Sequence, residues 1–173
     1  MNRRKSIITG LAGATAVAAL SSTANAAEAK AAPKSDNPEL EGVRALLKAH
    51  DEAMTGHDMD GVLATFASDG VIIGSGPGEL WSGTEEIKGA YENFFKGFDK
   101  GAQKFHYNHR FGGLSADMGW LVASGEINAK KDGKEIAFPI NISMTVAKSG
   151  SDWKIAAMHF STLTGPGEDE PKK

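Results

Sequence analysis

The sequence has no cysteine among its 173 residues. Disulfide bonds and thiol-based catalysis are therefore excluded. A surplus of basic residues is also missing, because 19 Lys and Arg stand against 22 Asp and Glu. A nucleic-acid partner needs a basic face that neutralises phosphates, so we expect no nucleic acid to bind.

Residues 1–26 have the pattern of an export signal. Arg3, Arg4 and Lys5 precede a mildly apolar stretch, and Ala24-Asn25-Ala26 provides small residues for cleavage. The stretch is too short and too rich in small residues to anchor the chain, so we expect no membrane span after signal removal. The alternatives are a disordered N-terminus or an uncleaved anchor. The Arg3-Arg4 pair leaves the Sec and twin-arginine routes both open, with a periplasmic or extracellular destination.

The mature chain is predicted to be one domain between two polar flanks. Removing the three basic residues of 1–26 leaves 16 Lys and Arg against 22 Asp and Glu, a formal charge of −6. Residues 27–36 have little to bury and predict a flexible tether, and residues 165–173 predict a disordered tail. We therefore place the folded domain at residues 37–164.

Helical patterns come first along this domain and strand patterns follow. Helices are predicted at 36–54, 59–68 and 84–100, capped by Asp36 or Asn37, by Asp58 and by Thr84. Strands are predicted at 71–75, 104–111, 118–131, 135–148 and 152–164. This order predicts an α+β fold in which a curved antiparallel sheet wraps over three N-terminal helices.

Two turns fix the register of the last three strands. Asp132-Gly133 is a two-residue hairpin signal, and Ser149 to Asp152 form a second turn. The resulting pairs put these residues on the core face: Leu121, Ala123, Ile127, Phe138, Ile140, Ile142, Met144, Val146, Trp153, Ile155, Ala157, His159 and Ser161. The outer face receives Trp120, Val122, Ser124, Glu126, Asn141, Ser143, Thr145, Ala156, Met158 and Phe160, a mixture that suits a subunit interface or a face covered by the tether or tail. One β-bulge would exchange the two sets beyond it.

The glycine-rich stretch Gly74 to Gly83 resembles a phosphate loop only superficially. Such a loop joins a strand directly to a helix and is followed by Lys and Ser or Thr, which are missing here. We interpret Gly76-Pro77-Gly78 as a hairpin tip, with Glu79 to Trp81 as a short returning strand. No cofactor is expected.

Candidate site residues follow from strand parity. His159 and Ser161 end the core-face series, and alternation along residues 104–111 places Tyr107 and His109 inward as well. Such a pocket has acid/base capacity near neutral pH, although each histidine could equally be a satisfied core residue. His106 and His109 lie three apart on a strand and point to opposite faces, so no metal site is expected.

Glu79 and Trp81 share one strand face and are further candidates at the rim of the pocket. Glu79 would act there as an acid, a base or a partner of a histidine. The alternative is that Trp81 packs as a lid and Glu79 is solvated. Candidate catalytic residues are accordingly His159 and Glu79, and candidate ligand-binding residues are His159, Ser161, His109, Tyr107, Trp81 and Glu79.

Three segments carry a family resemblance: Asp60, Phe66, Ala67 and Asp69; Glu79, Trp81 and Gly83; and Trp153, Ile155, His159 and Ser161. Together they resemble the SnoaL-like branch of the nuclear transport factor 2 (NTF2) superfamily. The resemblance implies a conical α+β barrel around a pocket, commonly paired as a homodimer through the outer sheet face. It does not imply one function.

Parts of the patterns known in that superfamily are missing. Ketosteroid isomerase chemistry uses a tyrosine and two acids, whereas the first predicted helix has no tyrosine and the late strands have no inward Asp. An Arg-x-Thr pair of the branch is replaced by Asn141-Ile142-Ser143. Three hypotheses stay open: an exported protein that binds a small apolar or semi-polar molecule, an acid/base isomerase, dehydratase or hydrolase, and a non-catalytic dimerisation module of an envelope assembly. Whether the protein is an enzyme is left open.

Overall fold

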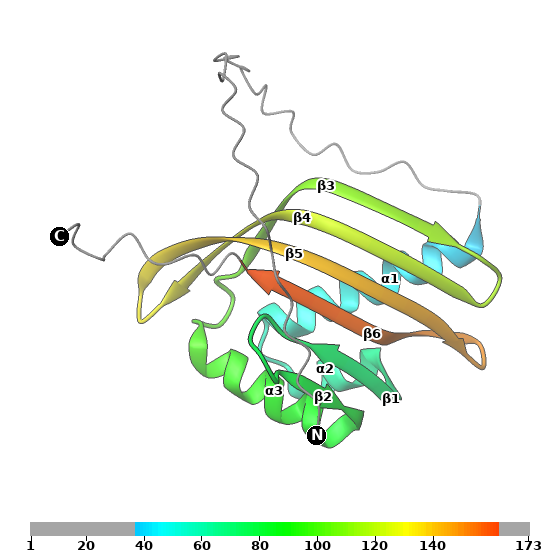
Figure 1. The fold of residues 1–173 in the computed structure, drawn as a ribbon, viewed down its shortest axis with the longest axis horizontal. Helices are drawn as coiled ribbons and strands as arrows, with labels where there is room; N and C mark the ends of the chain where they lie inside the picture. Colours follow the sequence, from blue (N-terminus) through cyan, green and yellow to red (C-terminus); the bar gives the residue numbers. More distant parts are fainter. Residues whose placement is uncertain (1–36, 163–173) are drawn as a thin grey trace, which may run out of the picture. The chain divides into compact units, whose positions relative to one another are not determined.

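Three helices and six strands make up residues 37–162, the part of the chain that this computed structural model describes (Figure 1). In chain order they are α1 Pro38–Thr55, α2 Met59–Thr65, β1 Phe66–Ile73, β2 Leu80–Ser82, α3 Gly83–Gly97, β3 Lys104–Leu114, β4 Met118–Lys131, β5 Lys134–Ser149 and β6 Asp152–Thr162. The predicted signal at 1–26, the tether at 27–36 and the tail at 165–173 lie outside the described residues. Within those residues no helix is both long and apolar enough to cross a membrane.

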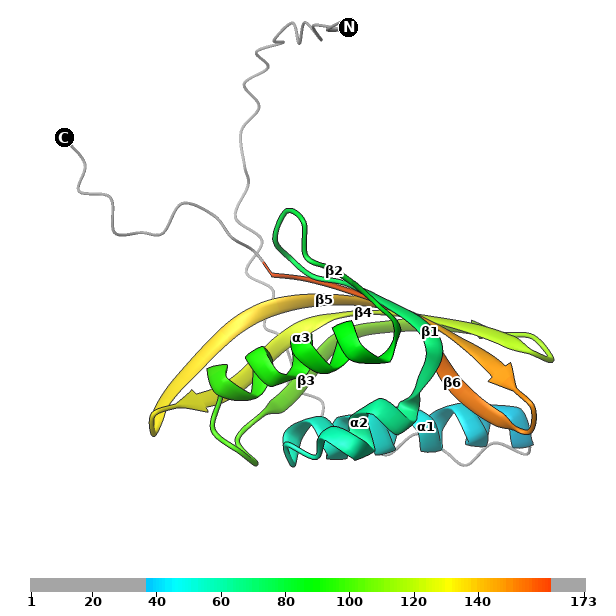
Figure 2. The same cartoon turned by 90° about the horizontal axis from the view of Figure 1, so that it is seen from below.

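The strands form one curved sheet with the three helices on its concave side (Figure 2). Their order is β2-β1-β6-β5-β4-β3, and neighbours are antiparallel except β1 and β6, which run parallel. The predicted α+β fold, a curved sheet over N-terminal helices, is confirmed. The parallel pair was not predicted, because nothing in the sequence says which late strand β1 joins.

Local chemistry explains where the helices begin and end. Asn37 Oδ1 accepts a hydrogen bond from the Glu39 amide at 3.0 Å, and Asp58 Oδ1 accepts one from the Gly61 amide at 3.0 Å. The cap predicted at Thr84 is wrong. Helix α3 begins earlier, at Gly83, with Ser82 at the N-cap position and no hydrogen bond from its side chain.

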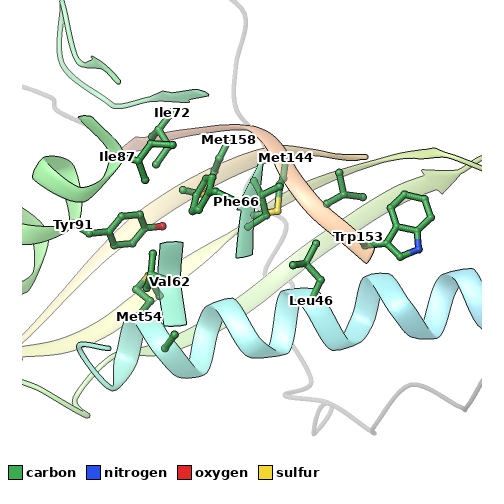
Figure 3. Close-up of a cluster of buried hydrophobic side chains, with 13 residues drawn as sticks. Leu46, Met54, Val62, Phe66, Ile72, Ile87, Tyr91, Met144, Trp153 and Met158 are labelled. Carbon is green, nitrogen blue, oxygen red and sulfur yellow. The ribbon is translucent and has the colours of Figure 1, made fainter. Parts of the chain in front are cut away.

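A hydrophobic cluster lies between the helices and the sheet (Figure 3). Val62, Ile72, Ile87 and Ile155 are fully buried, and each such side chain stabilises the fold by about 1.5–3 kcal/mol. At the edge of the cluster Trp153 Nε1 donates to the Glu39 carboxylate at 2.9 Å, which fastens the start of α1 to β6.

The glycine-rich stretch is a hairpin, as predicted. Gly78 has φ +83°, a left-handed conformation that favours glycine. The amide of Gly76 donates to Glu79 Oε2 at 2.7 Å, so the carboxylate braces the turn from within.

The register predicted for the Asp132-Gly133 hairpin is confirmed along its whole length. β4 and β5 pair without a shift from Met118 opposite Ala147 to Lys131 opposite Lys134. The inner positions of both strands are buried or partly buried, as the prediction required.

A β-bulge in β6 overturns the predicted facing of its second half. Val146 pairs with Ile155 but Thr145 pairs with Ala157, so Ala156 is the extra residue. Beyond the bulge Met158 and Phe160 turn towards the helices, and Ala157, His159 and Ser161 turn outward. The prediction that these last three lie on the core face is therefore wrong.

A second bulge does the same in β3. Tyr107 pairs with Gly125 and His109 pairs with Ser124, which leaves Asn108 as the extra residue. The predicted inward orientation of His109 is wrong, because Arg110 takes the inner position opposite Ala123.

Candidate functional site

A cavity of about 390 Å³ lies between the inner face of the sheet and helices α1 and α3. Its walls are predominantly apolar and aromatic. The lining residues are Leu47, His50, Asp51, Met54, Ile72, Trp81, Ala90, Tyr91, Phe94, Phe98, Phe105, Tyr107, Arg110, Leu121, Ala123, Ile127, Phe138, Ile140, Ile142, Met144, Met158, Phe160 and Thr162.

Stacked and tilted aromatic rings shape one wall of this cavity. The ring centroids of Phe94 and Phe98 are 4.7 Å apart, and those of Phe98 and Phe138 are 6.0 Å apart. These contacts join α3 and the segment after it to β5. Offset and tilted ring pairs are favourable beyond their buried area, so the wall is held in a defined shape.

A chain of three polar side chains runs from the surface to the cavity. The Asp51 side chain is 51% exposed, and its Oδ1 lies 3.5 Å from Nδ1 of His50. His50 is only 4% exposed, and its Nε2 lies 2.6 Å from the hydroxyl of Tyr91. Burial, together with the negative charge of Asp51, raises the pKa of Tyr91 far above its ordinary value. The phenol is therefore neutral at physiological pH.

The tautomer of His50 decides the direction of its hydrogen bond with Tyr91. When neutral His50 carries its proton on Nδ1, towards Asp51, its Nε2 accepts a hydrogen bond from the Tyr91 hydroxyl. An imidazole and a phenol in hydrogen-bond contact beside a cavity are groups able to exchange protons with a bound molecule.

Strand β3 adds Tyr107 and Arg110 to the same cavity. The guanidinium carbon of Arg110 lies 5.2 Å from the centroid of the Tyr107 ring, a cation–π distance. Burial, and secondarily the charge of Asp51, raises the pKa of Tyr107 to about 12, against a smaller opposing effect of Arg110. Both side chains are hydrogen-bond donors at neutral pH.

Of the predicted ligand-binding residues, Trp81 and Tyr107 line this cavity. Glu79 does not line it, because its carboxylate braces the turn at Gly76. Whether any of these residues binds a ligand stays a prediction.

The other three predicted residues do lie together, but on the opposite side of the sheet. His109, His159 and Ser161 line a shallow depression of about 340 Å³ on the outer face. The remaining lining residues are Phe111, Val122, Ala123, Ser124, Asn141, Ile142 and Ser143. The two bulges have moved this whole group out of the main cavity.

Five polar residues of the cavity were not predicted: His50, Asp51, Tyr91, Arg110 and Thr162. A sequence signal exists for His50, which interrupts the apolar stripe of α1 at a position that must face the core. Tyr91 occupies the same kind of position in α3. No group of three or more potential metal ligands gathers anywhere in residues 37–162.

Solved structures with the same fold include several small bacterial proteins. A ketosteroid isomerase-like protein from Erwinia carotovora atroseptica is 25% identical with a TM-score of 0.59, over 75% of this chain and 99% of that one. A candidate dehydratase of the NTF2-like family from Streptomyces avermitilis is 17% identical with a TM-score of 0.60, over 73% and 97%. A candidate calcium/calmodulin-dependent protein kinase II association domain from Xanthomonas campestris is 22% identical with a TM-score of 0.64, over 77% and 94%.

The similarity to these solved structures supports the fold, whereas the family is assigned from a match to the sequence. No protein of curated function matches the chain. The SnoaL-like domain family matches residues 43–165, which include nearly all of the described fold and every residue of the cavity. The chain therefore belongs to the SnoaL-like domain family of the NTF2-like superfamily.

Proposed function

We propose that this protein binds a small, largely apolar molecule in the cavity between α1, α3 and the sheet. The observation that carries the proposal is the cavity itself, about 390 Å³ and lined mainly by aromatic and aliphatic side chains with a few polar groups. Protein interiors are normally close-packed, and such a void forfeits packing energy. Its size falls at the lower end of small-molecule pockets, which suits a ligand of one or two rings.

Filling the cavity from one side tests this proposal. Ala90 lines the cavity from α3, so Ala90→Phe would occupy part of it, whereas Ala45→Phe places the same ring on the exposed face of α1. The probe is naphthalene-2-carboxamide, a neutral two-ring amide, titrated by isothermal calorimetry. We expect Ala90→Phe to weaken binding at least about tenfold, or about 1.4 kcal/mol, and Ala45→Phe to leave it unchanged. Equal binding by both variants, or no binding by the wild type, would reject the proposal.

A second candidate function is acid/base catalysis on a bound ligand. The 2.6 Å contact between His50 and Tyr91, extended by Asp51, favours it because these groups can hold and return a proton beside the cavity. The candidate dehydratase and the ketosteroid isomerase-like protein share the fold and lend support by analogy only.

Proton exchange measures this activity without knowledge of the natural substrate. The probe is 2-tetralone, a two-ring ketone, in D₂O: a base removes an α-proton to give the enolate, and deuterium returns to the same carbon. NMR follows the loss of the α-proton signal. We expect Tyr91→Phe and His50→Leu to slow exchange by about 10²-fold or more while Ala45→Phe has no effect. Exchange by the wild type no faster than in buffer leaves binding as the function.

We also propose that two copies pair through the outer sheet face. Phe111, Trp120 and Met118 are 64%, 53% and 55% exposed there, more apolar surface than a solvated face usually carries. Sedimentation velocity tests the pairing. Phe111→Glu should give a monomer. Leu80→Glu, on β2 at the other edge of the sheet, should leave the dimer intact. A monomeric wild type would contradict the proposal.

Export of the protein is a further proposal, resting on the basic, apolar and small-residue pattern of residues 1–26. Native mass spectrometry of protein taken from the host's envelope fraction would report the mature N-terminus and any retained ligand together. A chain that keeps residues 1–26 and stays in the cytoplasm contradicts export.

A further inference from the structure

The bulge at Asn108 has a chemical consequence for the cavity. Without it, strand alternation would place His109 inward and Arg110 in solvent. With it, Arg110 lies on the inner face opposite Ala123 and becomes part of the cavity lining. Bulges commonly re-aim a side chain beside a functional site.

The surroundings of Arg110 leave its charge available to a ligand. Across residues 37–162, no carboxylate forms an ion pair with this guanidinium. The Tyr107 ring, whose centroid is 5.2 Å from the guanidinium carbon, holds the guanidinium next to the phenol without neutralising it. The two side chains thus offer adjacent donors at the wall of an apolar cavity, and Arg110 is also exposed to solvent.

We propose that the ligand is an aromatic or alicyclic monocarboxylate, whose carboxylate is held by Arg110 and Tyr107 while its ring occupies the apolar cavity. This inference rests on the proposed binding function. A planar guanidinium matches a carboxylate through two parallel N–H···O bonds, and a phenol can donate a third. The Asp51 carboxylate lines the same cavity, so a second acid group on the ligand would meet a like charge there.

A matched pair of probes isolates the charge of the ligand. Naphthalene-2-carboxylate and naphthalene-2-carboxamide share shape and ring, and only the first is an anion. Both are titrated by calorimetry against the wild type, Arg110→Met, Arg110→Lys and Tyr107→Phe. Arg44→Met is the control, because Arg44 pairs with Glu41 on α1 and does not line the cavity.

We expect the wild type and Arg44→Met to prefer the carboxylate about tenfold or more. Arg110→Met should abolish this preference, Arg110→Lys should keep part of it, and Tyr107→Phe should reduce it severalfold. Because the guanidinium is exposed at the rim, added salt should shrink the preference in the wild type.

Two results would overturn the inference and leave the binding function standing. One is equal affinity of the wild type for the two probes, and the other is a preference that survives Arg110→Met. If neither probe binds the wild type, the proposed function and this inference fail together. Circular dichroism of each variant shows whether it is folded, and Arg110→Lys keeps the test decisive should Arg110→Met not fold.

Discussion

The buried contact between His50 and Tyr91 leads to a quantitative prediction about stability. Tyr91→Phe removes a hydroxyl that lies 2.6 Å from His50 Nε2, in a place where the two residues are only 4% and 5% exposed. Water has little access to the nitrogen left behind. An unpartnered buried polar group costs about 1–3 kcal/mol, so we expect the free energy of unfolding to fall by about 2 kcal/mol. His50→Leu should cost a similar amount, because it leaves the phenol unpartnered.

The double variant Tyr91→Phe/His50→Leu separates this bond from other effects. With both polar groups gone nothing is left unsatisfied, so the double variant should cost no more than one single variant, rather than the sum of two. Urea unfolding of the four proteins at one pH gives the coupling energy. Additive losses, or a Tyr91→Phe loss below about 0.5 kcal/mol, would show that the contact does not stabilise the fold and would remove the basis for a proton chain.

Three further predictions concern other polar groups. Hydrogen bonds from Lys148, and to a lesser degree from Trp153, lower the pKa of Glu39. The stability that these bonds add is present above the ordinary pKa of the carboxyl and is lost as pH falls through the lowered pKa. Glu39→Gln should therefore be less stable than the wild type near neutral pH, and urea titrations should show this difference closing in acid. Burial lowers the pKa of His57 from 6.5, so the unfolded chain takes up the proton first and the free energy of unfolding falls as pH drops below 6.5. In His57→Asn, where asparagine tolerates the φ of 51°, the free energy of unfolding should no longer fall in this pH range. An unchanged pH dependence would show that His57 is not its cause. Both amide atoms of Gln103 are buried without a hydrogen-bond partner among residues 37–162, so Gln103→Met should raise the free energy of unfolding by about 1 kcal/mol in urea, whereas a decrease would mean that the amide is satisfied in solution.

Local signals were sufficient to predict that three helices form, although not where each one begins and ends, and to predict the β4–β5 hairpin. Asp132 and Gly133 adopt φ values of 52° and 76°, which Asp and Gly tolerate and most residues do not. These two residues therefore predict the turn and the register of every residue pair between β4 and β5. The pairing of β1 with β6 has no such signal, because it joins segments far apart in the chain, such as Phe66 with Ile155.

The sequence of β6 contains a signal for its bulge, which is missed when strand alternation is simply counted on from the preceding turn. Apolar residues occupy odd positions at Trp153 and Ile155 and then even positions at Met158 and Phe160. An unbroken strand would expose Met158 and Phe160 and bury His159. Each large apolar side chain gains about 1.5–3 kcal/mol on burial, which outweighs the one backbone hydrogen bond that an extra residue cannot form within the sheet. A switch of the apolar residues from odd to even positions within one strand therefore predicts a bulge.

The bulge in β3 carries no comparable signal, and it decides the chemistry of the cavity. Phe105 and Tyr107 indicate the inner face, but the next inner residue is Arg110, which no hydrophobic pattern would place there. The cost of bringing a guanidinium to an apolar cavity is reduced by its exposure at the rim and by the Tyr107 ring beneath it. Burial alone does not explain the inward position of Arg110, whereas the carboxylate ligand proposed above would supply a reason for it.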